Sequence, residues 1–129
     1  LLGDGKVLVT GGFSALGASA AAQLYDPSTN TWSLTGPMID GRLSHTTTLL
    51  RDGRVLAAGG AGTDGDVAAS ELYDPATGIW SPAAPMSAGR SNHAATLLVD
   101  GGVLVVGDDG GNSTEIYDPV TGSWSSRLP

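Results

Sequence analysis

One short pattern occurs three times in this chain, and the repetition constrains the fold more than any other feature of the sequence. A Tyr-Asp-Pro segment recurs, and a tryptophan follows seven residues after each tyrosine. The three pairs are Tyr25 and Trp32, Tyr73 and Trp80, and Tyr117 and Trp124. Asp-Gly pairs recur upstream at 4–5, 52–53 and 100–101, which places successive copies 48 residues apart. A fixed period of this length indicates three similar supersecondary units in a row.

Each unit is predicted to form four short antiparallel strands, a to d. In the middle unit these strands are expected at residues 45–50, 54–58, 68–73 and around Trp80. The Asp-Gly pair is typical of a two-residue hairpin that demands positive φ, and it would join strands a and b. The Asp-Pro-x-Thr segment is typical of a turn that would join strands c and d. Four-stranded sheets at this period predict an all-β chain built from β-propeller blades.

Strand a of the first unit has no counterpart at the beginning of the printed sequence. We therefore expect a partial blade over 1–37 and full blades over 38–85 and 86–129. Three blades fall short of the four to eight that close a propeller ring. The sequence predicts either a part of a longer propeller or a subunit that completes a ring with copies of itself as a homo-oligomer.

Glycine doublets follow strand b of the first two units, at Gly11-Gly12 and Gly59-Gly60, and Gly107-Asp108 takes their place in the third. A double glycine, then a tyrosine, then six residues and a tryptophan resembles the kelch repeat, and the resemblance covers nearly the whole chain. It implies that the glycines allow a tight strand exit and that the aromatic residues pack within and between blades. The residues expected to have these structural roles are Gly11, Gly12, Tyr25, Trp32, Gly59, Gly60, Tyr73, Trp80, Tyr117 and Trp124.

Residues 7–18 also look like the glycine-rich turn of a short-chain dehydrogenase. The repeat argues against a dinucleotide site, because Gly12 precedes Tyr25 by 13 residues and Gly60 precedes Tyr73 by the same 13. The Tyr-x-x-x-Lys pair of that family is absent as well, since a threonine lies four residues after each repeat tyrosine. A lone glycine pattern has a high false-positive rate, so the segment is interpreted as part of a blade.

The charge and the residue types exclude several functions. The formal net charge of −7, from 13 acidic and 6 basic residues, disfavours nucleic acid and an anionic membrane surface as partners. The sequence contains no cysteine and no non-repeated catalytic set, so we predict neither a cofactor nor a metal. Some kelch propellers are copper radical oxidases resembling galactose oxidase, which use a tyrosine cross-linked to cysteine. This chain cannot supply that cofactor itself, but it could be a fragment of such an enzyme with catalytic residues elsewhere.

The two histidines occupy equivalent positions in the repeat. His45 and His93 lie 48 residues apart, each in a Gly-Arg-x-x-His segment that contains Arg42 or Arg90. Repeated identity favours a structural role at the start of strand a, with a metal or ligand site near the propeller channel as the alternative.

The b–c loops are the variable part of the repeat, whereas the a–b and c–d turns are nearly identical. Variable loops on a repeated frame are where binding function usually resides. Acidic loop residues could bind Ca²⁺, but solvated turns are the favoured interpretation. We therefore predict a non-catalytic scaffold that binds a protein or glycan through its b–c and d–a loops. The candidate ligand contacts are Arg42, Arg90, His45, His93, Phe13, Asp64, Asp66, Asp108 and Asn112.

Overall fold

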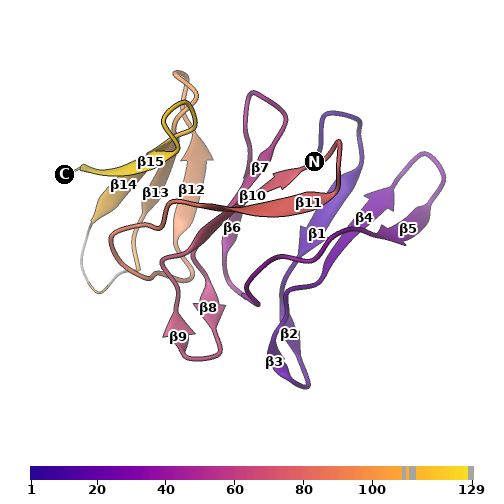
Figure 1. The fold of residues 1–129 in the computed structure, drawn as a ribbon, viewed down its shortest axis with the longest axis horizontal. Coiled ribbons are helices and arrows are strands. Elements are labelled where there is room, and N and C mark those ends of the chain that lie inside the picture. Colours follow the sequence, from indigo (N-terminus) through magenta and orange to yellow (C-terminus); the bar gives the residue numbers. More distant parts are fainter. Residues whose placement is uncertain (109, 111–112, 128–129) are drawn as a thin grey trace.

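The computed structural model describes residues 1–108, 110 and 113–127, and these residues form three antiparallel sheets in a row (Figure 1). Blade 1 contains β1 (Val7–Thr10), β4 (Ala22–Asp26) and β5 (Thr31–Leu34). Blade 2 contains β6 (Thr46–Leu49), β7 (Val55–Ala58), β10 (Ser70–Asp74) and β11 (Ile79–Ala83). Blade 3 contains β12 (Ala94–Leu97), β13 (Val103–Val106), β14 (Thr114–Asp118) and β15 (Ser123–Arg127). No helix able to cross a membrane is present among the described residues.

The predicted all-β, blade-type fold class is confirmed, and the described part of blade 1 is a three-stranded sheet. Blades 2 and 3 each pair their strands in chain order, and blade 1 pairs β1 with β4 and β4 with β5. The structure adds two small hairpins where only loops were expected. They are β2–β3 (Phe13–Ser14 and Gly17–Ala18) and β8–β9 (Ala61–Gly62 and Gly65–Asp66). Strands of two residues are too short to show a period-two pattern, which explains why sequence patterns did not indicate them.

The repeated turns adopt the conformations that their residues favour. The glycines of the three Asp-Gly pairs, Gly5, Gly53 and Gly101, have φ values of 88°, 90° and 96°. The aspartate of each pair accepts a hydrogen bond from the backbone amide two residues later, at 3.0 Å in all three turns. These turns therefore close without help from the rest of the fold.

Neighbouring blades pack through two different faces. We call one the leucine face, which carries Leu8 and Leu24 in blade 1, Leu56 and Leu72 in blade 2, and Leu104 and Ile116 in blade 3. The other is the aromatic face, which carries the repeated Tyr–Trp pair of each blade. The leucine face of blade 1 packs on the aromatic face of blade 2, and the leucine face of blade 2 packs on that of blade 3. The core therefore lies between blades.

Hydrogen bonds reinforce both junctions. Trp80 donates from Nε1 to the Gly36 carbonyl of the preceding blade unit at 2.9 Å, and Trp124 donates to the Ala84 carbonyl at the same distance. Within each blade the tyrosine and tryptophan rings lie 5.1 to 5.3 Å apart in a tilted arrangement. The expected roles of the aromatic residues follow from these contacts.

The first glycine of each doublet makes room for the next blade. A Cβ on Gly11 would lie 2.3 Å from the Arg42 carbonyl, and one on Gly59 would lie 2.5 Å from the Arg90 carbonyl. The amide of the second glycine donates to that same carbonyl, at 2.9 Å from Gly12 and 2.8 Å from Gly60. In blade 3, Asp108 has a φ of 55°, a left-handed value that aspartate tolerates better than most residues.

Candidate functional site

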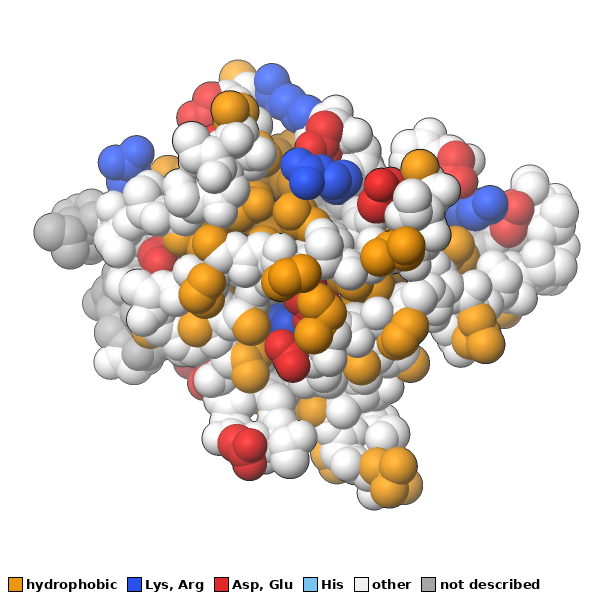
Figure 2. Space-filling view, in the orientation of Figure 1, with side chains coloured by type: hydrophobic (Ala, Val, Ile, Leu, Met, Phe, Trp, Pro, Cys, Tyr) orange, Lys and Arg blue, Asp and Glu red, His pale blue; other side chains and the backbone are white. Residues whose placement is uncertain are grey.

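The b–c hairpins project from one edge of the molecule, opposite the a–b and c–d turns (Figure 1). Their tips carry different chemistry. Phe13 and Leu16 of hairpin β2–β3 are 81% and 98% exposed. Asp64 and Asp66 of hairpin β8–β9 are exposed as well. Figure 2 shows hydrophobic side chains at the first tip and acidic ones at the second. The two tips thus present an apolar anchor and a negative charge side by side on one edge.

A buried arginine, Arg42, lies at the base of the second hairpin, β8–β9, and we call its set of hydrogen bonds the arginine clamp. The Arg42 guanidinium donates from Nη1 to the Gly59 carbonyl at 2.6 Å and to the Ala69 carbonyl at 2.9 Å, which ties the exit of strand b to the entry of strand c. Its Nη2 donates to Glu71 Oε1 at 2.6 Å. The Glu71 carboxylate also accepts the amides of Ile39 and Asp40 at 2.7 and 3.1 Å. One buried ion pair therefore holds both loops at the base of the hairpin.

Blade 3 repeats this clamp. Arg90 donates to the Gly107 and Ser113 carbonyls at 3.1 and 3.2 Å and to Glu115 Oε2 at 2.8 Å. The Glu115 carboxylate accepts the Ser87 amide at 2.9 Å. Because the same groups are linked in two blades, the clamp is an architectural element of the repeat.

Burial changes the interpretation of the two arginines. Arg42 and Arg90 are both 0% exposed, so the ligand contacts predicted for them on the loop face are not available in this structure. The sequence correctly placed them at the entry to strand a, but their side chains turn inward toward the glutamates. A buried charge is retained only when it is paired and hydrogen-bonded, and both arginines meet that condition.

The two histidines lie at the blade junctions. His45 Nε2 shares a hydrogen bond with the Thr10 hydroxyl of blade 1 at 2.8 Å, and His93 Nε2 shares one with the Thr46 hydroxyl of blade 2 at 3.0 Å. Burial, aided by the nearby Arg42 charge, lowers the pKa of His45 to about 4. Burial and Arg90 lower the pKa of His93 in the same way. Both imidazoles are therefore neutral near pH 7 and serve as junction contacts.

A depression of about 330 Å³ lies at the base of hairpin β8–β9. It is lined by three aspartates, Asp40, Asp64 and Asp66, together with glycines and Val67. The described residues nevertheless contain no group of three or more His, Cys, Asp or Glu side chains arranged to hold a metal ion. Of the remaining loop candidates, Asp108 is exposed, and Asn112 lies outside the described residues.

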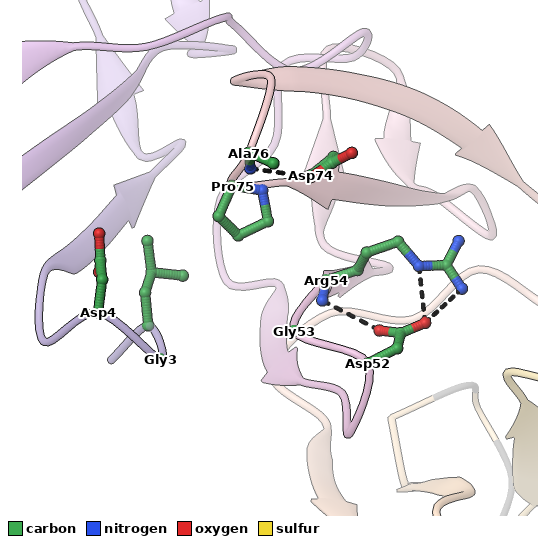
Figure 3. A pocket seen from close by; sticks show the side chains of 9 residues that line it. Gly3, Asp4, Asp52, Gly53, Arg54, Asp74, Pro75 and Ala76 are labelled. Carbon is green, nitrogen blue, oxygen red and sulfur yellow. Dashed lines mark hydrogen bonds and ion pairs between the residues drawn. The ribbon is translucent and has the colours of Figure 1, made fainter.

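The opposite edge carries two equivalent notches between blades. One, of about 380 Å³, lies between the a–b turns of blades 1 and 2 (Figure 3). The other, of about 210 Å³, lies at the same place between blades 2 and 3. Their carboxylates are engaged within the turns: Asp52 pairs with Arg54 at 2.7 Å, and Asp74 accepts the Ala76 amide at 2.9 Å. Arg54 holds the pKa of Asp52 below its usual value. These notches follow from the repeat and carry no distinctive chemistry.

Sequence reasoning missed four residues at the edge that carries the b–c hairpins. Leu16 is the most exposed large apolar residue of the hairpin, and Asp40 adds a third carboxylate to the depression. Glu71 and Glu115 are the partners of the arginines. A signal for them was present, because each glutamate precedes the repeat tyrosine by two residues.

Comparisons with known proteins show which fold this chain shares. The family described as the kelch motif matches residues 2–39. No curated protein matches the chain. Among solved structures, the chain is similar to a fungal alcohol oxidase of the AA5 family in complex with copper, with a TM-score of 0.75 and 21% identity. The likeness covers 96% of this chain and 28% of that one, so the chain spans little more than a quarter of the oxidase structure. At this identity the likeness shows the fold alone.

The described residues of this chain contain no cluster of ligands for a metal such as the copper in that oxidase complex. The sequence has no cysteine, and both histidines direct Nε2 to threonine hydroxyls. The repeat tyrosines of blades 2 and 3 are buried in the junctions.

Proposed function

We propose that this chain, which belongs to the kelch-repeat family, is a non-catalytic binding scaffold whose contact edge is formed by hairpins β2–β3 and β8–β9. The observation that carries the proposal is the contrast between the repeated residues of the blades and the exposed residues at the tips of the two hairpins. The repeated arginine, glutamate and histidine side chains make hydrogen bonds inside or between blades. Phe13 and Leu16, in contrast, expose apolar side chains for which the described part of the chain offers no cover. Neighbouring exposed apolar side chains on a rigid frame mark interaction sites more often than single exposed apolar side chains do.

The chemistry of the tips suggests the kind of partner. Phe13 supplies a rigid aromatic group of the type that anchors protein interfaces. Asp64 and Asp66 add negative charge beside it, and Asp40 extends this charge into the depression. A protein surface with an apolar pocket and basic residues at its rim fits this arrangement better than a neutral glycan does. A glycan that stacks on Phe13 is the other outcome of the experiment.

The experiment selects ligands for the wild-type chain from a displayed peptide library and from a glycan array, and then tests three variants. The double variant Phe13→Ser/Leu16→Ser should weaken the selected ligands at least about tenfold, because an anchor side chain contributes more than about 1.4 kcal/mol to binding. Asp64→Asn/Asp66→Asn should weaken basic peptides and reduce the salt dependence of binding.

Val120→Ser is the matched control, because Val120 is 93% exposed on the opposite edge. It should leave binding unchanged. Thermal melts verify that all variants fold, which is expected because every substituted residue is exposed. Selected ligands that bind the Phe13→Ser/Leu16→Ser variant as tightly as the wild type would contradict the proposal, and so would a selection that yields no ligand.

A further inference from the structure

We propose that Ile39 and Asp40 are the specificity-determining centre of the contact edge, and that they recognise a protein segment in which an apolar residue lies beside a lysine or arginine. Both residues belong to the d–a connection, which we define as residues 38–42 in the link from β5 to β6. The inference rests on the proposed function, and it adds a third element to the two hairpins.

The d–a connection lies between the two hairpins. On one side it follows the end of hairpin β2–β3, because the Met38 amide donates to the Ala20 carbonyl at 2.8 Å. A Cβ on Gly41 would lie 2.3 Å from the Ala18 carbonyl oxygen, so the two backbones are in contact. On the other side, Asp40 and Gly41 line the depression at the base of hairpin β8–β9. The connection therefore occupies the middle of the contact edge.

Hydrogen bonds and burial hold the backbone of this connection in place. The Ile39 and Asp40 amides donate to the two carboxylate oxygens of the buried Glu71, at 2.7 and 3.1 Å. Met38, the preceding residue, is buried in the core between blades 1 and 2. A segment that is already ordered loses little conformational entropy when it binds a partner. The Ile39 and Asp40 side chains therefore project from a backbone that is fixed before binding.

The equivalent connection between blades 2 and 3 shows that the blade structure does not require these two side chains. Ser87 and Ala88 take the places of Ile39 and Asp40 there. The Ser87 amide donates to the Glu115 carboxylate at 2.9 Å, in the same way as the Ile39 amide donates to its own glutamate. A serine and an alanine are thus compatible with the same backbone contact, so the isoleucine and the aspartate are available for another role.

Ile39 and Asp40 are exposed although both blades at their junction are present. Ile39 is 55% exposed, and the Asp40 side chain is 57% exposed. The equivalent Ser87, at the junction of blades 2 and 3, is exposed as well, so exposure at this position is a property of the repeat. Since the backbone of the connection contacts hairpin β2–β3, Ile39 extends the apolar part of the edge beyond Phe13 and Leu16.

The charges around Asp40 indicate what the partner segment contains. The Arg42 Nη2 atom lies 3.9 Å from Asp40 Oδ2, outside hydrogen-bond distance, because it binds Glu71 at 2.6 Å. The described lysines and arginines with solvent-accessible side chains lie at the a–b turns or at the end of β15, and they are Lys6, Arg51, Arg54 and Arg127. A cationic side chain from a partner would therefore complement the Asp40 carboxylate. Because Ile39 is the adjacent residue, the partner's apolar and basic residues must also lie close together.

The test selects peptides for the wild-type chain from a displayed random library and measures their affinity by fluorescence anisotropy. The selected peptides should contain an apolar residue beside a lysine or arginine. The double variant Ile39→Ser/Asp40→Ala copies residues 87 and 88 of the equivalent connection, so it should fold and keep the wild-type melting temperature. It should bind the selected peptides at least about tenfold more weakly. The matched control is Ile79→Ser, because Ile79 is 63% exposed on β11, and it should bind them as wild type does.

A second measurement tests the contact between Asp40 and the basic residue of the peptide. Glutamine replaces the basic residue in the peptide, and Asp40→Asn removes the charge from the chain. Each change alone should weaken binding roughly two- to fivefold. The two changes together should weaken binding no more than either one, because they remove the same interaction.

The outcomes separate this inference from the proposed function. If Phe13→Ser/Leu16→Ser loses the selected peptides and Ile39→Ser/Asp40→Ala binds them as tightly as wild type, the inference is overturned and the proposed function stands. Independent, multiplicative effects of Asp40→Asn and the peptide change would also overturn it, and so would a selection that yields glycans but no peptide. If both double variants bind the peptides as wild type does, the proposed function fails as well.

Discussion

Blades 1 and 2 contain the same Tyr-Asp-Pro segment and the same tryptophan, yet their environments differ. In blade 2 the Tyr73 hydroxyl shares a hydrogen bond with Thr35 of the neighbouring unit at 2.8 Å, and the tyrosine is fully buried. In blade 1 the Tyr25 hydroxyl donates to Asn30 of its own turn at 2.9 Å, and Trp32 faces solvent. The repeat motif therefore encodes half of an interface, and the neighbour supplies the other half.

The residue two positions before the repeat tyrosine also differs in burial between blades 1 and 2. Glu71 is 2% exposed and pairs with Arg42, whereas its equivalent in blade 1 is the exposed Gln23. The carboxylate of Glu71 lies beside a buried cation, whereas the described residues place no cation beside the amide of Gln23.

The largest effect should come from truncating the two tryptophans. Trp80→Ala should lower the free energy of unfolding by about 3–5 kcal/mol, because it removes a large buried ring and leaves a cavity at the junction. Trp32→Ala should lower it by less than about 1 kcal/mol, because this ring is mostly in water. Urea unfolding followed by circular dichroism measures both losses. Equal losses of unfolding free energy would show that the two tryptophans do not differ in their contribution to stability.

The second test exchanges the residues that differ between the blades. Glu71→Gln should destabilise the chain by roughly 3 kcal/mol, because Arg42 then remains buried with only the exposed Asp40 carboxylate, 3.9 Å away, as a counter-charge. Gln23→Glu is the matched control and should change stability by less than about 0.5 kcal/mol, since the residue is exposed. Thermal melts of both variants at pH 7 provide the measurement. A small effect of Glu71→Gln would mean that water reaches Arg42.

The smallest effect concerns pH and the junction histidine. Because the folded state lowers the pKa of His45 to about 4 from 6.5, the unfolded chain binds more protons between these values. The contribution of His45 is therefore complete above pH 6.5 and is lost as the pH falls toward 4. At pH 5 the loss should be about 1–2 kcal/mol, after allowance for partial exposure.

His45→Gln should reduce the dependence of stability on pH between 7 and 5, and urea midpoints at the two pH values measure this change. His93 contributes in the same direction and remains in the variant, so part of the dependence should persist. An unchanged dependence would show that His45 is protonated without cost in the folded chain.

Much of the fold could be predicted because its determinants are local. Asp52-Gly53 specifies a hairpin wherever it occurs, and Asp74-Pro75 specifies a turn. The apolar run 55–57 between such turns leaves few alternatives to a short strand. The candidate site could be predicted only in part. Phe13 and Asp64 were placed on the b–c edge by strand alternation, but the hairpins that raise them into solvent gave no periodic signal.

Arg42 shows where sequence reasoning failed and why. A Gly-Arg segment at a loop is equally compatible with a surface contact and with a buried clamp. The decision depends on Glu71, which lies 29 residues later and reaches the guanidinium only when the blade folds. Pairings of this kind are non-local, and a single sequence does not state which charges become neighbours.

The sequence by itself determined the period, the turns and the order of strands within each blade, because turn geometry and strand alternation act over a few residues. Only the tertiary structure decided which copies of an identical residue are buried. Trp32 and Trp80 have the same local sequence signal, and the difference between 59% and 7% exposure comes from the blade that stands against one and not the other. Burial is a property of contacts between units, and the repeat describes each unit alone.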